Sequence, residues 1–128
     1  MHITPLYAAL LALLFVALSV RALRMRKTLR IAIGDSGNPA MLRAMRVHSN
    51  FAEYVPLGLI LISMVELRGA APLVVHGLGV ALLAGRLSHA WGVSQVRENF
   101  AFRIFGMGMT LGTIIACAGL LLWAFVVG

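Results

Sequence analysis

Four long apolar segments constrain this chain more than any other feature of its sequence. They run from about Ile3 to Val20, from about Phe51 to Val65, from about Ala70 to Leu87 and from about Ile104 to Val127. A helix needs about 20 residues to cross the hydrocarbon layer of a bilayer, and a helix satisfies its own backbone hydrogen bonds there. The second segment is shorter, so we expect its helix to begin earlier, near Met41. The sequence therefore predicts an all-α fold, an integral membrane four-helix bundle.

The composition agrees with a membrane protein. Of the 128 residues, 61% are hydrophobic and 12% are charged, whereas soluble domains are nearer half apolar and a quarter charged. One cysteine, Cys117, excludes an intramolecular disulfide and a multi-cysteine metal site, and we expect it to be inert packing. The formal net charge is +7. In a membrane protein such an excess more often sets the orientation in the bilayer and attracts anionic lipid than binds nucleic acid. We expect one domain over residues 1–128, with no metal site and no nucleic-acid partner.

The basic residues predict the orientation. Ten of the eleven lie in or beside the first and third connections between the apolar segments: Arg21, Arg24, Arg26, Lys27, Arg30, Arg43, Arg46, Arg86, Arg97 and Arg103. Positively charged connections stay in the cytoplasm, so both termini are expected on the opposite side. No basic residue of the signal-peptide kind precedes the first apolar run. We therefore expect that segment to be a retained helix.

The first connection contains the sequence GDSGNPAM, which allows two interpretations. A glycine-rich loop before a helix can bind phosphate, but no lysine follows the glycines at the spacing of a phosphate-binding loop. The favoured interpretation is structural. Asn38 caps a helix whose first residue is Pro39, and Gly34 and Gly37 form the turn before it.

A polar stretch, RAMRVHSNFAEYVP, opens the second segment at residues 43–56. Arg43, Arg46, Asn50 and Glu53 are spaced by three, four and three residues, which predicts one stripe on one helix face. A carboxylate inside a membrane is unfavourable unless it is paired, so we expect Arg46 and Asn50 to be the partners of Glu53. Pro56 should bend this helix, because it cannot donate a backbone hydrogen bond.

Two interpretations of the stripe remain open. In one, the arginines extend to the lipid head groups and Glu53 forms an ion pair that fixes the register of the helices. In the other, the stripe lines a pocket for an anionic or zwitterionic ligand that enters from the cytoplasmic side.

The stretch RAMRVHSNFAEYVPLGLILISMVE resembles the second-helix signature of the membrane-associated proteins in eicosanoid and glutathione metabolism, the MAPEG superfamily. The matching residues are Arg46, Asn50, Glu53, Tyr54 and Pro56. The GDSGNP loop and Glu66 resemble small bacterial members. The resemblance implies a homotrimer in a bacterial inner membrane, with periplasmic termini and with the first and third connections in the cytoplasm.

The resemblance also implies an activity. It implies that glutathione binds as co-substrate between subunits and reacts with lipophilic electrophiles in a transferase or peroxidase reaction. Residues that would hold the tripeptide are Arg21 (or Arg24), Arg46, Asn50, Glu53 and Tyr54. Arg103, or alternatively Arg97, would be catalytic, because a nearby cation stabilises a thiolate. The alternative is a non-catalytic member that binds a lipid or partner protein in the same groove.

The third segment departs from that pattern. The characterised transferases carry tyrosines near the site, whereas this chain reads GRLSHAWG. His89 either hydrogen-bonds the ligand or lies with Trp91 in an interfacial aromatic belt, and we expect the belt. Small residues at spacings of four predict close helix packing. They are Gly77, Ala81 and Gly85 in the third segment and Gly108, Gly112 and Ala116 in the fourth.

Overall fold

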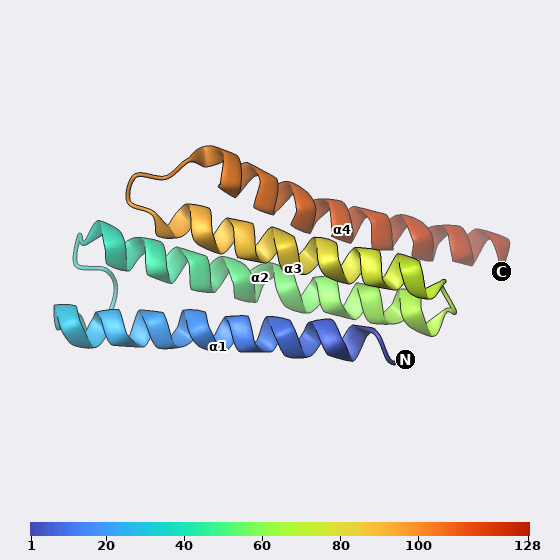
Figure 1. The fold of residues 1–128 in the computed structure, drawn as a ribbon, viewed down its shortest axis with the longest axis horizontal. Helices are drawn as coiled ribbons and strands as arrows, with labels where there is room; N and C mark the ends of the chain where they lie inside the picture. The colour runs from blue at the N-terminus through green and yellow to red at the C-terminus, as the bar shows by residue number, and fades with distance from the viewer.

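The computed structural model describes residues 1–128 as four helices (Figure 1). Helix α1 covers Thr4–Leu29, α2 covers Pro39–Leu67, α3 covers Pro72–Ser94 and α4 covers Phe100–Val127. All four are long and apolar enough to cross a membrane. The predicted all-α fold with four membrane-spanning helices is therefore confirmed.

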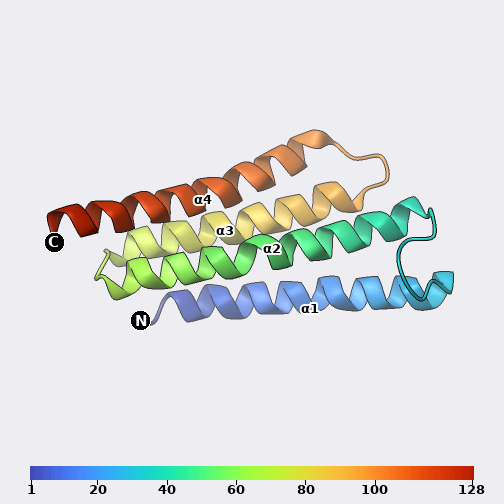
Figure 2. The ribbon, with the colours of Figure 1, turned by 180° about the vertical axis from the view of Figure 1, so that it is seen from behind.

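Helices α2 and α3 lie in the middle of the molecule, and α1 and α4 flank them on opposite sides (Figures 1 and 2). Helix α1 packs against α2 and α3, and α4 also packs against α2 and α3. The α1–α2 and α3–α4 connections lie at one end, which we call the basic end; both termini and the α2–α3 turn lie at the other (Figure 1). This arrangement gathers most of the basic side chains at one end.

The helices extend beyond the apolar runs that predicted them. Helix α1 continues past Val20 to Leu29, and α4 begins at Phe100, ahead of Ile104. Arginine and lysine favour helix as strongly as leucine does, so the basic residues after Val20 prolong α1 instead of ending it. As a result Arg21 and Arg103 project from helices.

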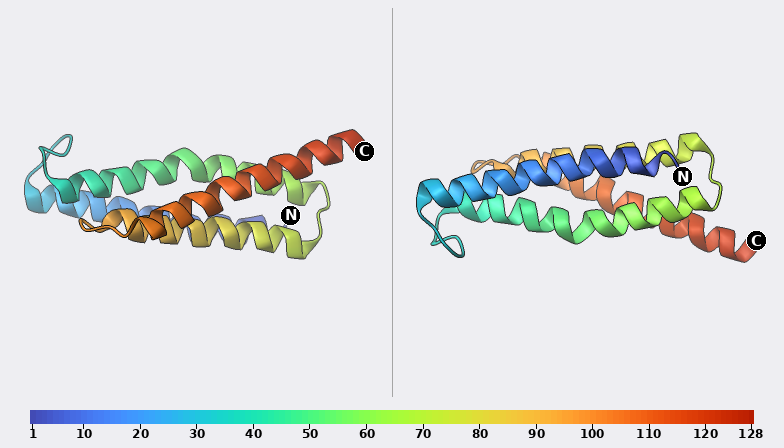
Figure 3. Two further views of the ribbon diagram at one scale, coloured as in Figure 1. Left: turned by 90° about the horizontal axis from the view of Figure 1, so that it is seen from above. Right: turned by 90° about the horizontal axis from the view of Figure 1, so that it is seen from below.

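The α1–α2 connection folds as its sequence predicts. The side chain of Asn38 accepts a hydrogen bond from the backbone N–H of Met41 at 3.0 Å, and Pro39 begins α2. Gly34 and Gly37 have φ angles of 69° and 73°, a left-handed conformation that favours glycine. The capping interpretation of GDSGNP is confirmed. Pro56 lies within α2, and Figure 3 shows α2 bent near its middle.

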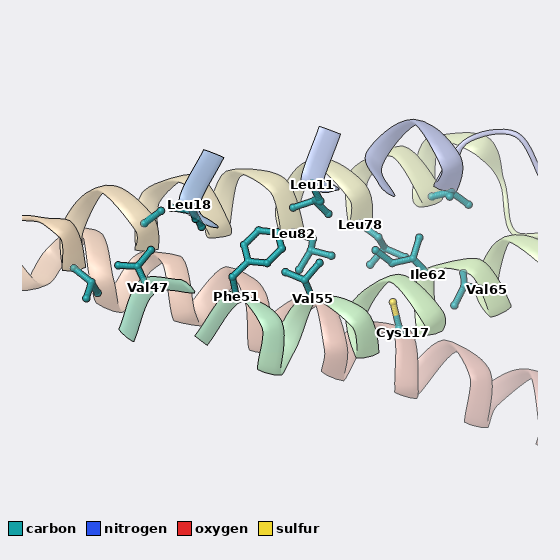
Figure 4. Packing of buried hydrophobic residues seen from close by; sticks show 13 residues of the cluster. Leu11, Leu18, Val47, Phe51, Val55, Ile62, Val65, Leu78, Leu82 and Cys117 are labelled. Atoms are coloured by element: carbon teal, nitrogen blue, oxygen red, sulfur yellow. The ribbon is translucent and has the colours of Figure 1, made fainter. Parts of the chain in front are cut away.

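The core is a narrow apolar seam between α1, α2 and α3. Phe51, Val55 and Leu82 converge there (Figure 4), and Cys117 of α4 is fully buried against the same cluster, as expected. Large apolar side chains elsewhere point outward; Phe125 is 82% exposed. Soluble monomers rarely expose continuous apolar surface on this scale, so this surface is suited to lipid or to further protein.

Glycines allow α3 and α4 to approach closely near the basic end. A Cβ atom added to Gly106 would lie 2.6 Å from the carbonyl oxygen of Gly85, and one added to Gly92 would lie 2.8 Å from the Cβ of Phe102. The predicted faces are only partly correct. Gly85 lies in the contact, whereas a Cβ atom added to Gly77, Gly108 or Gly112 would meet nothing within 4 Å. The buried face of α4 is formed by Gly106, Thr110, Thr113 and Cys117. Gly108 and Gly112 each lie two residues farther along the helix than a residue of this face, so they lie on its other side.

Candidate ligand-binding site at the basic end

An ion cluster joins three elements at the basic end. Arg43 of α2 and Arg103 of α4 lie 3.2 and 3.4 Å from the same oxygen, Oε1 of Glu98 in the α3–α4 connection. Arg43 also donates to the carbonyl oxygen of Val93 at 3.1 Å. The side chain of Glu98 is 6% exposed, and its second oxygen, Oε2, is buried without a hydrogen-bond partner. The cluster therefore contains one carboxylate with an unused acceptor.

This cluster lines a cavity of about 250 Å³. Its lining residues are Pro39, Leu42, Arg43, Arg46, Val93, Glu98 and Arg103. Three arginines against one glutamate leave the cavity with a positive charge. We call it the arginine cavity.

Arg46 also lines a second cavity, of about 460 Å³, between α1 and α2. Arg26, His48 and Ser19 contribute polar groups to it, and His48 Nε2 lies 3.0 Å from Ser19 Oγ. Arg46 is exposed and forms no ion pair within the chain. It is therefore available to a ligand in either cavity.

The predicted polar stripe divides in the structure. Arg43 turns toward Glu98, and Asn50 turns into the bundle, whereas Arg46 and Glu53 stay on the exposed surface of α2. The expected pairing of Glu53 with Arg46 or Asn50 is wrong for the single chain. Arg46 and Glu53 are separated by about 10 Å along the helix axis. No hydrogen bond joins the amide N–H groups of Asn50 to Glu53, and the amide oxygen of Asn50 accepts from Arg86 instead.

Glu53 occupies an unusual position for a carboxylate. It is exposed and lies midway between Pro39 and Leu67, the ends of α2, or about 21 Å from either end at 1.5 Å per residue. Tyr54, beside it, is half-buried. A charge that faces lipid at this depth is strongly unfavourable. In a membrane this face of α2 is therefore one that protein, ligand or water has to cover.

Arg86 is buried, contrary to its predicted place among the basic residues beside the third connection. Its side chain lies inside the bundle, and the residue is 1% exposed. Its Nη2 atom lies 2.8 Å from Asn50 Oδ1 and 3.1 Å from His89 Nδ1, and its Nη1 atom lies 3.4 Å from Thr110 Oγ1. Its guanidinium carbon lies 5.8 Å from the centre of the Phe51 ring, and its Nε atom has no partner. No carboxylate pairs with it.

The buried position of His89 contradicts a second prediction. We expected it in an aromatic belt beside Trp91, but His89 is 3% exposed and contacts Arg86, while Trp91 is 62% exposed. The absence of a side chain on Gly106 makes room for the histidine, because a Cβ atom there would lie 2.7 Å from the Cβ of His89. The spacing of three between Arg86 and His89 is the sequence signal that places both on one helix face.

The remaining predicted residues reach the basic end in different ways. Arg21 of α1 donates to the hydroxyl of Ser94 in the last turn of α3. Arg103 is half exposed within the ion cluster. The alternatives, Arg24 and Arg97, are exposed and form no ion pair. The structure thus brings Arg46 and Arg103 to one cavity, while Glu53 and Tyr54 lie deeper along α2.

The fold and this site define a class: a multi-pass membrane protein with four spanning helices and a cationic cavity at one end. The sequence matches the MAPEG family over residues 4–123, and the chain belongs to that family. It is 36% identical over 121 residues to the inner membrane protein YecN of Escherichia coli strain K12, covering 94% of this chain and 91% of that protein. YecN of Escherichia coli O6:H1 matches to the same extent. The chain is accordingly a multi-pass inner membrane protein.

Proposed function

We propose that this protein binds glutathione between the subunits of a homotrimer, near the basic end, and joins it to lipophilic electrophiles or uses it to reduce peroxides. The observation that carries this proposal is the exposed polar face of α2. Arg46 and Glu53 lie on the surface of a helix that is otherwise apolar there, and neither has an ion-pair partner within the chain.

The charges of the face complement those of glutathione. Glutathione has two carboxylates and one ammonium, and it requires several cations and one acid from its site. Arg46 and Arg103 line the arginine cavity, and Arg21 reaches the same end of the bundle. Glu53 supplies an acid farther along α2, and Tyr54 and the amide of Asn50 supply uncharged hydrogen-bonding groups.

A trimer explains why the face is open in one chain. In a membrane, Glu53 is tolerated only if protein, ligand or water covers it. A second copy packed against this face would cover it and would form a groove with the arginines at its mouth. Membership of the MAPEG family supports this assembly.

The chemistry follows from the same groups. The thiol of glutathione loses its proton, and the thiolate sulfur attacks an electrophilic carbon. A carbon–sulfur bond forms while the leaving group departs with its electron pair. In the peroxidase reaction the thiolate attacks a peroxide oxygen, the O–O bond breaks, and the alkoxide leaves and takes up a proton. The thiol of a second glutathione then displaces water from the resulting sulfenic acid and forms the disulfide. In this proposal Arg103 is the nearby cation that stabilises the thiolate, and an apolar electrophile reaches the site through the bilayer.

One observation favours a second candidate, a non-catalytic member that binds a lipid or a partner protein. Arg103 shares its charge with Glu98, and His89 points into the bundle, where a family tyrosine would face glutathione. Both features weaken thiolate stabilisation without removing the groove.

A two-stage experiment separates these candidates. Glutathione binding is measured on the detergent-purified protein, and turnover is then measured with an activated chloronitrobenzene and with an organic hydroperoxide. Binding with turnover supports the enzyme, and binding without turnover supports the second candidate. A protein that does not bind glutathione contradicts the proposed function.

A further inference from the structure

The end of α1 carries two cations that the chain does not pair. Lys27 lies in the last turn of the helix and Arg30 directly follows the helix, and both residues are exposed. Neither forms an ion pair with any of the four acidic residues of the chain, which are Asp35, Glu53, Glu66 and Glu98. Neighbouring cations without a counter-ion attract an anion from outside the chain.

These two residues line one cavity, which we call the α1-end cavity. Its volume is about 370 Å³, and its lining residues are Arg26, Lys27, Arg30, Ile31 and Ala32. Three of the five are basic and none is acidic. Nη1 of Arg26 already donates to the carbonyl oxygen of Gly34 at 2.9 Å, so Lys27 and Arg30 supply the cations that remain for a ligand. The α1-end cavity and the arginine cavity have no lining residue in common.

The backbone holds the two cations together. Arg30 has a φ angle of 54°, in the left-handed region, and its backbone N–H donates to the carbonyl oxygen of Lys27. Ile31, the next residue, is buried against Met41 and Ala44 of α2. This apolar contact anchors the wall of the cavity on α2. The cavity is therefore a fixed feature of the turn after α1.

The length of α1 places this cavity at the level of lipid head groups. Helix α1 has 26 residues, and about 20 are enough to cross the hydrocarbon layer. When the crossing begins near Thr4, the last six or so residues extend about 9 Å beyond the hydrocarbon. Lys27 lies within this extension and Arg30 follows it. Phospholipid phosphates lie at the same level, where basic pockets bind anionic head groups.

The connection that follows α1 favours a lipid over a soluble anion. Ile33 is an apolar residue in this connection, and it is 89% exposed. Figure 3 shows the connection projecting to the side of the bundle, where lipid surrounds a membrane protein. A phospholipid offers a phosphate to the cations and an apolar region to the isoleucine, whereas a soluble phosphate offers only the first.

We propose that Lys27 and Arg30 bind the phosphate of an anionic phospholipid, such as phosphatidylglycerol, at the α1-end cavity. Ile33 lies against the apolar part of the same lipid. An anionic lipid is preferred to phosphatidylethanolamine, because the ammonium of the latter offsets the charge of its own phosphate. The site does not depend on glutathione, and it attaches the turn after α1 to the membrane surface.

The test measures lipid binding to the detergent-purified protein by native mass spectrometry. The parent protein is titrated separately with dioleoyl phosphatidylglycerol and dioleoyl phosphatidylethanolamine, and it should bind the first more tightly. A basic residue near a lipid surface contributes about fivefold in affinity. Lys27→Gln and Arg30→Gln should therefore each weaken phosphatidylglycerol binding about fivefold, and the double variant about 25-fold. The preference over phosphatidylethanolamine should disappear in the double variant.

Two controls separate a specific site from general charge. Arg97→Gln removes one exposed, unpaired cation at the same end of the molecule but outside the α1-end cavity, and it should keep the parent affinity. Lys27→Arg with Arg30→Lys keeps both charges and should also bind as the parent does. Excess glycerol 3-phosphate, which has the phosphate without the acyl chains, should not displace the lipid.

Four results would overturn the inference. They are equal binding of both lipids by the parent, parent affinity in the double variant, an equal loss in Arg97→Gln and Lys27→Gln, and displacement of the lipid by glycerol 3-phosphate. The second result, together with a lowered melting temperature, would leave Lys27 and Arg30 only a role at the negative end of the α1 dipole. The fourth would identify a site for soluble phosphate.

Discussion

Arg86 of α3 donates a hydrogen bond to the side-chain oxygen of Asn50 on α2, with 2.8 Å between Nη2 and Oδ1. This contact lies within the bundle and links the α2 polar stretch to a cation without a carboxylate partner. The amide N–H groups of Asn50 donate to nothing within the chain, so they are the groups that Asn50 has free for a ligand. The contact with Arg86 therefore fixes the orientation of the amide.

The first prediction tests this contact. Asn50→Leu removes the acceptor from a buried arginine, so we expect it to lower the free energy of unfolding by about 1.5–3 kcal/mol, the usual loss for a hydrogen bond to a charged group. Asn50→Asp keeps an acceptor and gives Arg86 a counter-ion, so it should retain most of the stability. Thermal unfolding in detergent measures both, and equal melting temperatures for the two variants would refute the role of Asn50.

The second prediction concerns the exposed acid of α2. Glu53→Gln keeps the size and removes the charge, and the proposed groove predicts weaker glutathione binding, by roughly a hundredfold if one charged partner is lost. The melting temperature without ligand should change little. Affinity and melting temperature are measured on the same preparation. A lower melting temperature with unchanged affinity of the folded fraction would instead make Glu53 a structural ion-pair partner of a neighbouring copy.

The third prediction concerns Arg103. A group that stabilises the thiolate should affect turnover more than ground-state binding, so Arg103→Ala should lower kcat while the affinity for glutathione falls less. Arg97→Ala is the matched comparison, because Arg97 lies in the adjoining connection and is exposed without an ion pair. Parent turnover in Arg103→Ala together with slow turnover in Arg97→Ala would transfer the role to Arg97.

The fourth prediction concerns orientation. The basic end carries both the α1–α2 and α3–α4 connections, and positively charged connections stay in the cytoplasm. Reporter fusions at Gly128 should therefore be active only as periplasmic reporters, and fusions within the α1–α2 connection only as cytoplasmic ones. Activity of a cytoplasmic reporter at Gly128 would reverse the orientation.

The elements of the fold follow from local signals that the sequence displays. Apolar runs of spanning length indicate the four helices, and the Asn38–Pro39 pair indicates where α2 begins. The ends of α1 and α4 were less predictable, because arginine and lysine prolong a helix beyond the apolar run.

The site was predictable only in part, because it depends on which helices meet. The sequence places Arg46, Asn50 and Glu53 on one helix but does not show that Asn50 meets Arg86. Basic residues near a connection usually face solvent, and only the packing of α3 against α2 and α4 shows that Arg86 is buried. Glu98 belongs to no motif in the sequence. It becomes part of the site only because two arginines from other helices contact its carboxylate.

Native mass spectrometry from mild detergent, with and without glutathione, tests most directly the claim that glutathione binds between subunits at the exposed face of α2. The account predicts that a complex of three chains binds glutathione. It also predicts that the Glu53→Gln variant still forms the complex of three chains but binds less glutathione. A single chain that binds glutathione as well as the complex does, or a three-chain complex that never gains glutathione, would contradict it.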